Sequence, residues 1–226
     1  MGPNARQLLE RAAPFDRWDD ESFPFGTSRD VQIGTAMLRA QRVTYVGELG
    51  WELYVPAEMS RSVYRALHEV SADGGEDLGL RNGGYYAVEG LRVEKAYRAW
   101  GHELSPDYTS LEAGLGFCVD LDDGDATFMG KDALLRQRDV EGGVAGLKRR
   151  LVCLQADISA NGDDAMGHPE IVPWGDEAIL FDGQHIGSAS SSAYGHTLDK
   201  GVFMGYLNHE EVGVGRCVDG ARSGLQ

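Results

Sequence analysis

Residues 42–55 read Arg-Val-Thr-Tyr-Val-Gly-Glu-Leu-Gly-Trp-Glu-Leu-Tyr-Val, and they decide the fold of the amino-terminal half of the chain. Apolar side chains recur at a spacing of two on both sides of a segment flanked by glycines, which is typical of two antiparallel strands joined by a turn. If the glycines flank a two-residue turn that contains Glu48, Tyr45 and Glu52 face each other across the hairpin. The pattern therefore predicts a hairpin with Tyr45 and Glu52 on one face.

Glu52 is the one charged residue in an otherwise apolar strand, between Trp51 and Leu53. A carboxylate in such a position either points to solvent or serves as a hydrogen-bond acceptor in a pocket. In the second case Tyr45, on the same face, would pack against a flat ring. Spacing alone leaves both interpretations open.

Outside this stretch the chain alternates between helical and strand-like patterns. Helical spacing predicts a helix over residues 5–12, one capped by Ser60, one over 86–97 and one over 130–138. In the third helix, Ala87, Leu91 and Glu94 are expected on one face.

The carboxyl-terminal part has only strand-like runs, at residues 151–154, 178–181, 186 and 202–204. Asp182-Gly183 between two of these runs predicts a tight hairpin turn. Residues 139–150 are rich in glycine and charge and predict a linker, and residues 157–176 predict a loop. We therefore expect two domains, residues 1–147 (α+β) and 148–226 (all β).

Composition limits the function classes. Thirty-six acidic residues against 21 basic ones leave a net charge of −15, which disfavours binding to nucleic acid or to a membrane surface. No apolar run is long enough to span a bilayer, and residues 1–6 lack a signal-peptide core. The three cysteines lie far apart, which argues against disulfides and a metal site and favours a cytoplasmic location.

The sequence resembles the glycine-cleavage T-protein (aminomethyltransferase) family, and most of all the branch fused to sarcosine and dimethylglycine dehydrogenases. The resemblance covers roughly residues 2 to 212. The motifs that carry it lie in collinear order at residues 22–25, 45–53, 84–87, 91–103, 111–117, 130–134 and 194–197. It implies an α+β fold in which a partial folate-binding aminomethyltransferase domain precedes a small antiparallel β-barrel-like domain.

The resemblance also implies a function. The family transfers a one-carbon unit from an aminomethyl or iminium donor to tetrahydrofolate. A pterin edge presents two parallel N–H donors, which match the two oxygens of a carboxylate, and the family uses the residue at Glu52 for this contact. The resemblance places Tyr45 in the same folate site.

Four further residues are weaker candidates. Trp100 follows the helix over 86–97 and is expected to line the folate site, and Tyr194 is expected to close the site of the folate tail. His102 and His196 lie beside them, although a lone histidine is more often simply solvated or hydrogen-bonded. We interpret Arg92 and Glu94, which diverge on one helix, as members of structural ion pairs.

Departures from the family pattern define the branch and raise an alternative. Val88 stands where the T-protein proper has an arginine, as in the dehydrogenase-fused branch, and residues 95–98 lack the cysteine of an iron–sulphur assembly branch. The family's catalytic aspartate is expected upstream of residue 1, so no catalytic residue is assigned here.

Two functions therefore stay open. In the first, an upstream polypeptide with a flavin-oxidase half completes an enzyme that takes folate and a small amine-derived donor. In the second, the chain is a non-catalytic module that binds folate or a partner protein, as in a phosphatase-regulatory relative of the family. The missing aspartate is the feature that distinguishes them.

The first prediction concerns activity. We expect the purified 226-residue chain to convert tetrahydrofolate with a glycine- or sarcosine-derived donor more slowly than about 1 per second, the lower range of ordinary enzymes. The reason is that positioning and proton transfer supply most of such a rate, and the aspartate assigned to them is absent. A steady-state assay that gives turnover at or above that rate would contradict this expectation.

Overall fold

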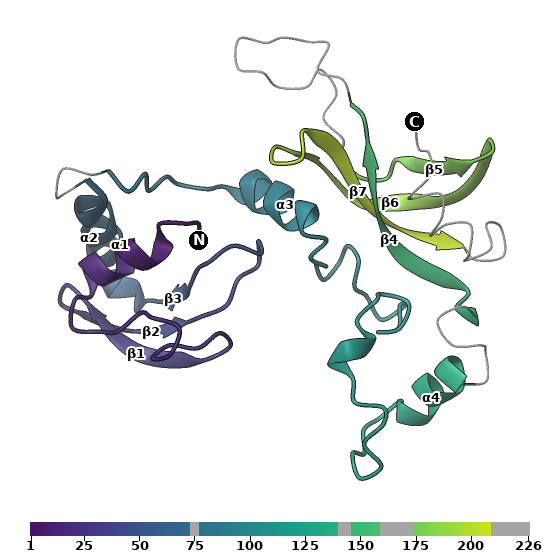
Figure 1. Cartoon of the computed structure of the whole chain (residues 1–226), viewed down its shortest axis with the longest axis horizontal. Coiled ribbons are helices and arrows are strands. Elements are labelled where there is room, and N and C mark those ends of the chain that lie inside the picture. The colour runs from purple at the N-terminus through teal and green to yellow at the C-terminus, as the bar shows by residue number, and fades with distance from the viewer. Residues whose placement is uncertain (73–76, 140–145, 159–173, 209–226) are drawn as a thin grey trace. The chain divides into compact units, whose positions relative to one another are not determined.

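The computed structural model describes residues 1–72, 77–139, 146–158 and 174–208 (Figure 1). The chain forms two compact units, Met1–Val88 and Glu89–Gln226. The elements in chain order are α1 (Ala5–Ala12), β1 (Ser28–Ile33), β2 (Ala36–Gln41), β3 (Glu52–Tyr54), the 3-10 helix η1 (Ala57–Met59), α2 (Ser60–Ala72), α3 (Tyr85–Glu94), the 3-10 helix η2 (Gly116–Cys118), α4 (Lys131–Asp139), β4 (Arg149–Ala156), β5 (Ala178–Phe181), β6 (Gln184–Gly195) and β7 (Lys200–Asn208).

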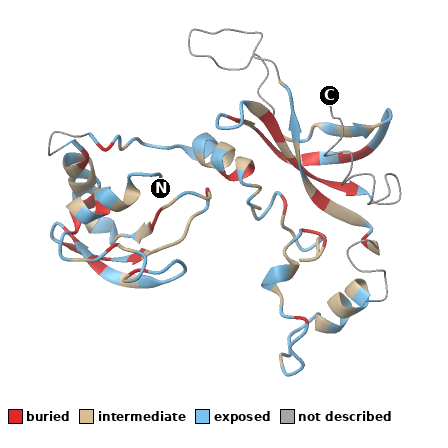
Figure 2. Cartoon of the chain, viewed as in Figure 1, coloured by how far each residue is buried: buried red, intermediate tan, exposed pale blue. Residues whose placement is uncertain are grey.

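The first unit contains a three-stranded antiparallel sheet in the order β1-β2-β3. Buried and exposed residues alternate along β1 and β2, as expected for strands with one face on a core. Val31 and Ile33 of β1 and Leu38 of β2 are buried on that face, and α1 and α2 contribute to the same core (Figure 2).

Three aromatic rings form the centre of this core. Trp18 is 1% exposed, and its ring lies edge-on to that of Trp51 at 5.4 Å and tilted to that of Phe23 at 5.6 Å. Such offset and edge-on arrangements are the favourable geometries for aromatic pairs. The indole N–H of Trp18 donates to the carbonyl of Ala13 at 3.3 Å, so its polar atom is satisfied within the core.

The second unit contains a four-stranded antiparallel sheet in the order β4-β7-β6-β5. The predicted turn at Asp182-Gly183 joins β5 and β6, and both of its residues have positive φ (48° and 79°). These signs are what a type I′ turn requires, and the Asp-Gly pair provides them at low strain. Within the described residues the sheet is open and does not close into a barrel.

Helix α3 packs against this sheet through a different face from the one predicted. Val93 and Arg92 are fully buried, whereas Ala87 and Leu91 are exposed. Val93 shares a hydrophobic cluster with residues of β4, β6 and β7. The helix also ends three residues earlier than expected, because Ala96 adopts a positive φ of 53° and the amide of Tyr97 turns back to the carbonyl of Arg92 at 2.9 Å.

Helices together with antiparallel sheets confirm the predicted α+β class, and α1 and β5 have the predicted bounds. The predicted cap at Ser60 is not observed, because its hydroxyl donates to the carbonyl of Ala57 at 2.8 Å. Much of the predicted linker (140–145) and loop (159–173) lies outside the described residues, and the domain boundary near residue 147 stays a prediction. No helix among the described residues is long and apolar enough to cross a membrane.

The hairpin turn generates a stability prediction. Gly183→Ala should lower the free energy of unfolding by about 1–2 kcal/mol, because a side chain is strained in the left-handed conformation. A Cβ at this position meets no atom within 4 Å, so conformation alone should account for the loss. Urea denaturation is the measurement. The matched control is Gly124→Ala, at a glycine that has equal space and no positive φ; an equal loss in both variants would contradict the turn assignment.

Candidate functional site

Glu52 begins β3 and is half-buried, and its carboxylate already has one hydrogen-bond donor. The hydroxyl of Tyr54 donates to Oε2 of Glu52 at 2.8 Å. The two residues are two apart on one strand, so their side chains share a face of the sheet. This contact raises the pKa of Tyr54, because ionising the phenol would place a second negative charge beside the carboxylate. Tyr54 therefore stays a neutral donor that orients Glu52.

The predicted hairpin register between Tyr45 and Glu52 is wrong. Glu52 pairs with Gln41 of β2, and residues 42–51 form an irregular connection in which Tyr45 is 37% exposed. The amide of Val43 turns back to the carbonyl of Gln41 at 3.1 Å, which ends β2 before the predicted strand begins.

The side chain of Arg42 helps to hold the chain at this bend. Its guanidinium donates to the carbonyl of Phe23 at 2.7 Å and pairs with Asp20 at 2.7 Å. These contacts anchor the connection to the segment before β1. Asp20 therefore takes part in fixing the position of the connection that carries Tyr45.

Trp100 and His102 lie on the loop that follows α3 in the second unit. Trp100 is 74% exposed, so its indole is available for stacking on a ligand. His102 is exposed as well, and its Nδ1 lies 3.4 Å from the carbonyl oxygen of Ser190 in β6. The residue that fixes this loop is their neighbour Glu103, which is fully buried.

Glu103 and Arg92 form a fully buried ion pair, with Nη1 of Arg92 and Oε2 of Glu103 2.7 Å apart. Glu103 also accepts the backbone N–H of Ala99 at 3.0 Å and the hydroxyl of Ser190 at 2.7 Å. Arg92 donates to the hydroxyl oxygen of Ser191 at 2.6 Å. The pair thus ties α3, the loop with Trp100 and β6 together.

Further contacts of this pair involve both charged and neutral partners. Arg92 forms a second ion pair, with Glu89 one turn earlier on α3, and donates to the carbonyl of Tyr97 at 2.9 Å.

The surroundings of Glu103 set its protonation state. Burial alone would raise the pKa of Glu103. Hydrogen bonds from Ser191, Ser190 and Ala99 and the charge of Arg92 outweigh it, so the pKa of Glu103 lies below its ordinary value. Glu103 is therefore ionised at neutral pH.

These contacts confirm the predicted structural ion-pair role for Arg92. Glu94, the other predicted member, accepts the backbone N–H of Thr197 at 2.8 Å and so holds the β6–β7 turn against α3. Sequence patterns gave no role to Glu103 or to Ser190 and Ser191. The Arg92–Glu103, Ser190–Glu103 and Arg92–Ser191 contacts join residues 11, 87 and 99 positions apart, so no local spacing could have identified these contacts.

Tyr194 and His196 lie where β6 enters the turn to β7. Their rings meet edge-on at 5.2 Å, and the hydroxyl of Tyr194 donates to Oδ1 of Asp199. This hydrogen bond raises the pKa of Tyr194. Tyr194 is partly exposed, so one face of an aromatic ring is available beside a histidine at this end of the sheet.

The predicted folate residues divide between the two compact units. Tyr45 and Glu52 belong to the first unit, and Trp100 and Tyr194 belong to the second. Within the described ranges, no group of three or more histidine, cysteine, aspartate or glutamate side chains is placed to hold a metal ion. Within the first unit, the half-buried carboxylate of Glu52 and the partly exposed ring of Tyr45 are the kinds of group that suit a flat, hydrogen-bonding organic ligand.

Comparison with known proteins shows the class to which this fold and these residues belong. Residues 1–123 match the family described as GCVT N-terminal domain, and residues 149–221 match the family described as glycine cleavage T-protein C-terminal barrel domain. The chain therefore belongs to the glycine-cleavage T-protein family.

Three individual relatives give a more specific comparison than the two family domains. The chain is 37% identical to human mitochondrial sarcosine dehydrogenase and 35% identical to human mitochondrial dimethylglycine dehydrogenase, with 99% and 96% of this chain aligned to 22% and 23% of those proteins. It is 32% identical to an aminomethyltransferase of Halothermothrix orenii, with 96% of this chain aligned to 54% of that protein. The chain thus spans about a fifth of the length of the two dehydrogenases.

The buried ion pair generates the prediction of this section. Arg92→Met should lower the free energy of unfolding by about 3–5 kcal/mol, because it leaves the carboxylate of Glu103 buried without its cation. Arg39→Met is the matched control, since Arg39 and Asp30 form a pair at 2.9 Å in which both side chains are about 60% exposed. Thermal or urea unfolding is the measurement. Similar small effects in both variants would mean that the buried pair does not organise the second unit.

Proposed function

We propose that this chain is the tetrahydrofolate-binding portion of a one-carbon transferase of sarcosine, dimethylglycine or glycine metabolism. Tetrahydrofolate is the substrate that accepts the carbon, and the donor is an aminomethyl or iminium group derived from a small amine. The observation that carries the proposal is the match of both family domains, in order, over residues 1–123 and 149–221. Identities of 35–37% over nearly the whole chain favour the dehydrogenase-fused branch.

The residues around Glu52 have the chemistry that a pterin requires. A carboxylate can accept about four hydrogen bonds, and Tyr54 supplies one of them. The remaining acceptor capacity suits the paired N–H donors of a pterin edge. In this proposal Glu52 binds the pterin, Tyr54 orients Glu52, and Tyr45 offers a half-exposed ring for packing. Trp100 and Tyr194 belong to the second unit, and their contact with folate stays a prediction.

The remaining parts of the proposal are the donor, the partner and the location. The names of the relatives suggest sarcosine or dimethylglycine as the source of the donor. The partner that we propose to produce this donor is the upstream flavin-oxidase polypeptide that the family resemblance implies. A cytoplasmic location stays a prediction, and both human relatives carry the word mitochondrial in their names.

The alternative function is folate binding without one-carbon transfer. An assay that detects folate binding but no turnover when the oxidase partner is present would favour this alternative.

Replacing the carboxylate tests the pterin contact. Glu52→Gln should weaken binding of tetrahydrofolate by about 1.5–3 kcal/mol, the range for a hydrogen bond to a charged group, which corresponds to roughly ten- to hundredfold in Kd. The amide presents one acceptor and one donor to a partner edge that has two donors. Isothermal titration calorimetry with the full 226-residue chain is the measurement.

Glu48→Gln is the control for this experiment, because Glu48 is an exposed acidic residue in the same connection and its replacement removes the same charge. We expect it to leave the affinity nearly unchanged. Equal losses for the two variants would assign the effect to general electrostatics and would remove the pterin role of Glu52. Tyr54→Phe should give an intermediate loss, because the carboxylate stays but is no longer oriented.

A further inference from the structure

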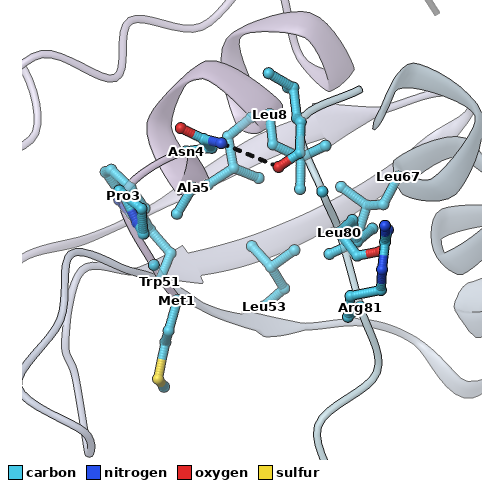
Figure 3. Close-up of a pocket in the computed structure, with 14 residues that line it drawn as sticks. Met1, Pro3, Asn4, Ala5, Leu8, Trp51, Leu53, Leu67, Leu80 and Arg81 are labelled. Atoms are coloured by element: carbon cyan, nitrogen blue, oxygen red, sulfur yellow. Dashed lines mark hydrogen bonds between the residues drawn. The ribbon is translucent and has the colours of Figure 1, made fainter. Parts of the chain in front are cut away.

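The segment between α2 and α3 is held against the first unit as far as Leu80. The N–H of Leu78 donates to the carbonyl of Ser71 at 3.0 Å, and the N–H of Leu80 donates to the hydroxyl oxygen of Ser71 at 3.1 Å. Leu80 also lines an apolar pocket of about 440 Å³, together with leucines of α1, α2 and β3 (Figure 3). These contacts fix the chain immediately before residue 81.

Residues 81–84 have a different environment. All four are exposed and lie outside any helix or strand, and α3 begins after them at Tyr85. Within the part of the chain that the structure describes, the backbone N–H of Gly83 has no hydrogen-bond partner. The peptide unit between Asn82 and Gly83 is therefore open to water and is not restrained by regular secondary structure.

The sequence of this segment places a side-chain amide directly before a glycine. The backbone nitrogen of the residue after an asparagine can attack Cγ of that side chain and close a succinimide ring. Glycine has no Cβ, so its nitrogen is unhindered and its backbone reaches the conformation that ring closure requires. Asn82 and Gly83 thus have the residue types, the exposure and the backbone freedom for this reaction.

Tyr64 of α2 contacts both atoms of the amide that change in such a reaction. Its hydroxyl donates to Oδ1 of Asn82 at 3.2 Å and lies 2.9 Å from Nδ2. Attack on Cγ moves negative charge onto Oδ1, and a hydroxyl donor at this oxygen stabilises that charge. The departing nitrogen needs a proton, which a hydroxyl within hydrogen-bond distance can supply. Tyr64 is 50% exposed, so it can recover the proton from water.

We propose that Asn82 is a site of spontaneous modification, at which the chain converts this asparagine to aspartate and isoaspartate with the help of the Tyr64 hydroxyl. The nitrogen of Gly83 forms a bond to Cγ of Asn82 and releases its proton to water. The Cγ–Nδ2 bond breaks, and the nitrogen leaves as ammonia. Water then opens the succinimide at either carbonyl, which gives aspartate or isoaspartate without any oxidant or reductant.

Both products change the chain shortly before α3. Each adds one negative charge and removes the amide donor that faces Tyr64. Isoaspartate also routes the main chain through Cβ, which lengthens it by one carbon between residues 82 and 83. Residue 82 lies near the end of the first unit, Met1–Val88, so the altered backbone precedes the passage into the second unit. The proposal does not depend on folate binding.

Peptide mapping by mass spectrometry tests the site in the full 226-residue chain, incubated at neutral to mildly alkaline pH. The peptide that contains Asn82 should give way to two products of equal mass, heavier by the difference between oxygen and NH. An isoaspartyl methyltransferase should label one of these products and not the other.

Two alanine variants identify the attacking nitrogen. Gly83→Ala should slow the loss of Asn82 by about tenfold or more, because a Cβ hinders the nitrogen of residue 83. The structure accommodates this change, since the added Cβ meets only the Cβ of Ala87, at 3.9 Å. Gly84→Ala is the matched control, because its added Cβ meets no atom within 4 Å and its nitrogen takes no part in the reaction. It should leave the rate unchanged.

A third variant tests the contribution of the fold. Tyr64→Phe should slow the reaction at Asn82 in the folded chain and have no effect in urea, where the contact with the hydroxyl is lost. A second Asn-Gly pair, at residues 161–162, lies outside the described residues and serves as the reference in the same samples. Its rate should not respond to the change at Tyr64.

Three results would overturn the proposal. Asn82 that stays intact in the folded chain but reacts in urea would show that the fold protects it. Equal slowing by Gly83→Ala and Gly84→Ala would exclude attack by the nitrogen of Gly83. An unchanged or faster reaction in folded Tyr64→Phe would show that the hydroxyl does not assist.

Discussion

The second unit depends on the need to neutralise a buried cation. Arg92 is fully buried, and an arginine cannot lose its charge in a protein, so the surrounding structure must supply partners. Glu103, Glu89 and Ser191 meet that need from a loop, a helix and a strand. Because these partners belong to different segments, the contacts of the two terminal nitrogens of Arg92 fix the relative positions of α3, the Trp100 loop and β6.

The sequence predicted the parts of the fold that depend on neighbouring residues, and it missed the parts that depend on distant contacts. Local signals were sufficient for α1 and for the Asp182-Gly183 turn, because caps, periodicity and positive φ are properties of neighbouring residues. They failed for the buried face of α3. Periodicity selected Leu91, whereas tertiary contacts bury Arg92 and Val93. A charged residue such as Arg92 is expected at the surface from sequence alone, because its distant partner Glu103 cannot be recognised there.

The candidate site likewise has features that the sequence could predict and features that it could not. Spacing left Glu52 open between a solvated and a pocket carboxylate, and the family resemblance implied its pterin contact. The structure adds Tyr54, whose hydroxyl orients Glu52. The contact between Tyr54 and Glu52 could have been predicted from the sequence, since residues two apart on a strand share a face. The register of β3 could not be predicted, because it depends on the anchoring of Arg42 to Phe23 and Asp20, residues about twenty positions earlier. A local turn at Val43 ends β2, and the non-local contacts of Arg42 hold the bend that follows.

β3 presents different side chains on its two faces. Its alternating side chains present Glu52 and Tyr54 on one face and Leu53 on the other, where the core is open. A three-residue strand paired on one side has few contacts to hold it, so its local opening requires little free energy. Because a ligand binds more tightly to groups that are already ordered, the pairing of β3 with β2 and the hydrogen bond from Tyr54 determine how well the carboxylate of Glu52 is positioned before a ligand arrives.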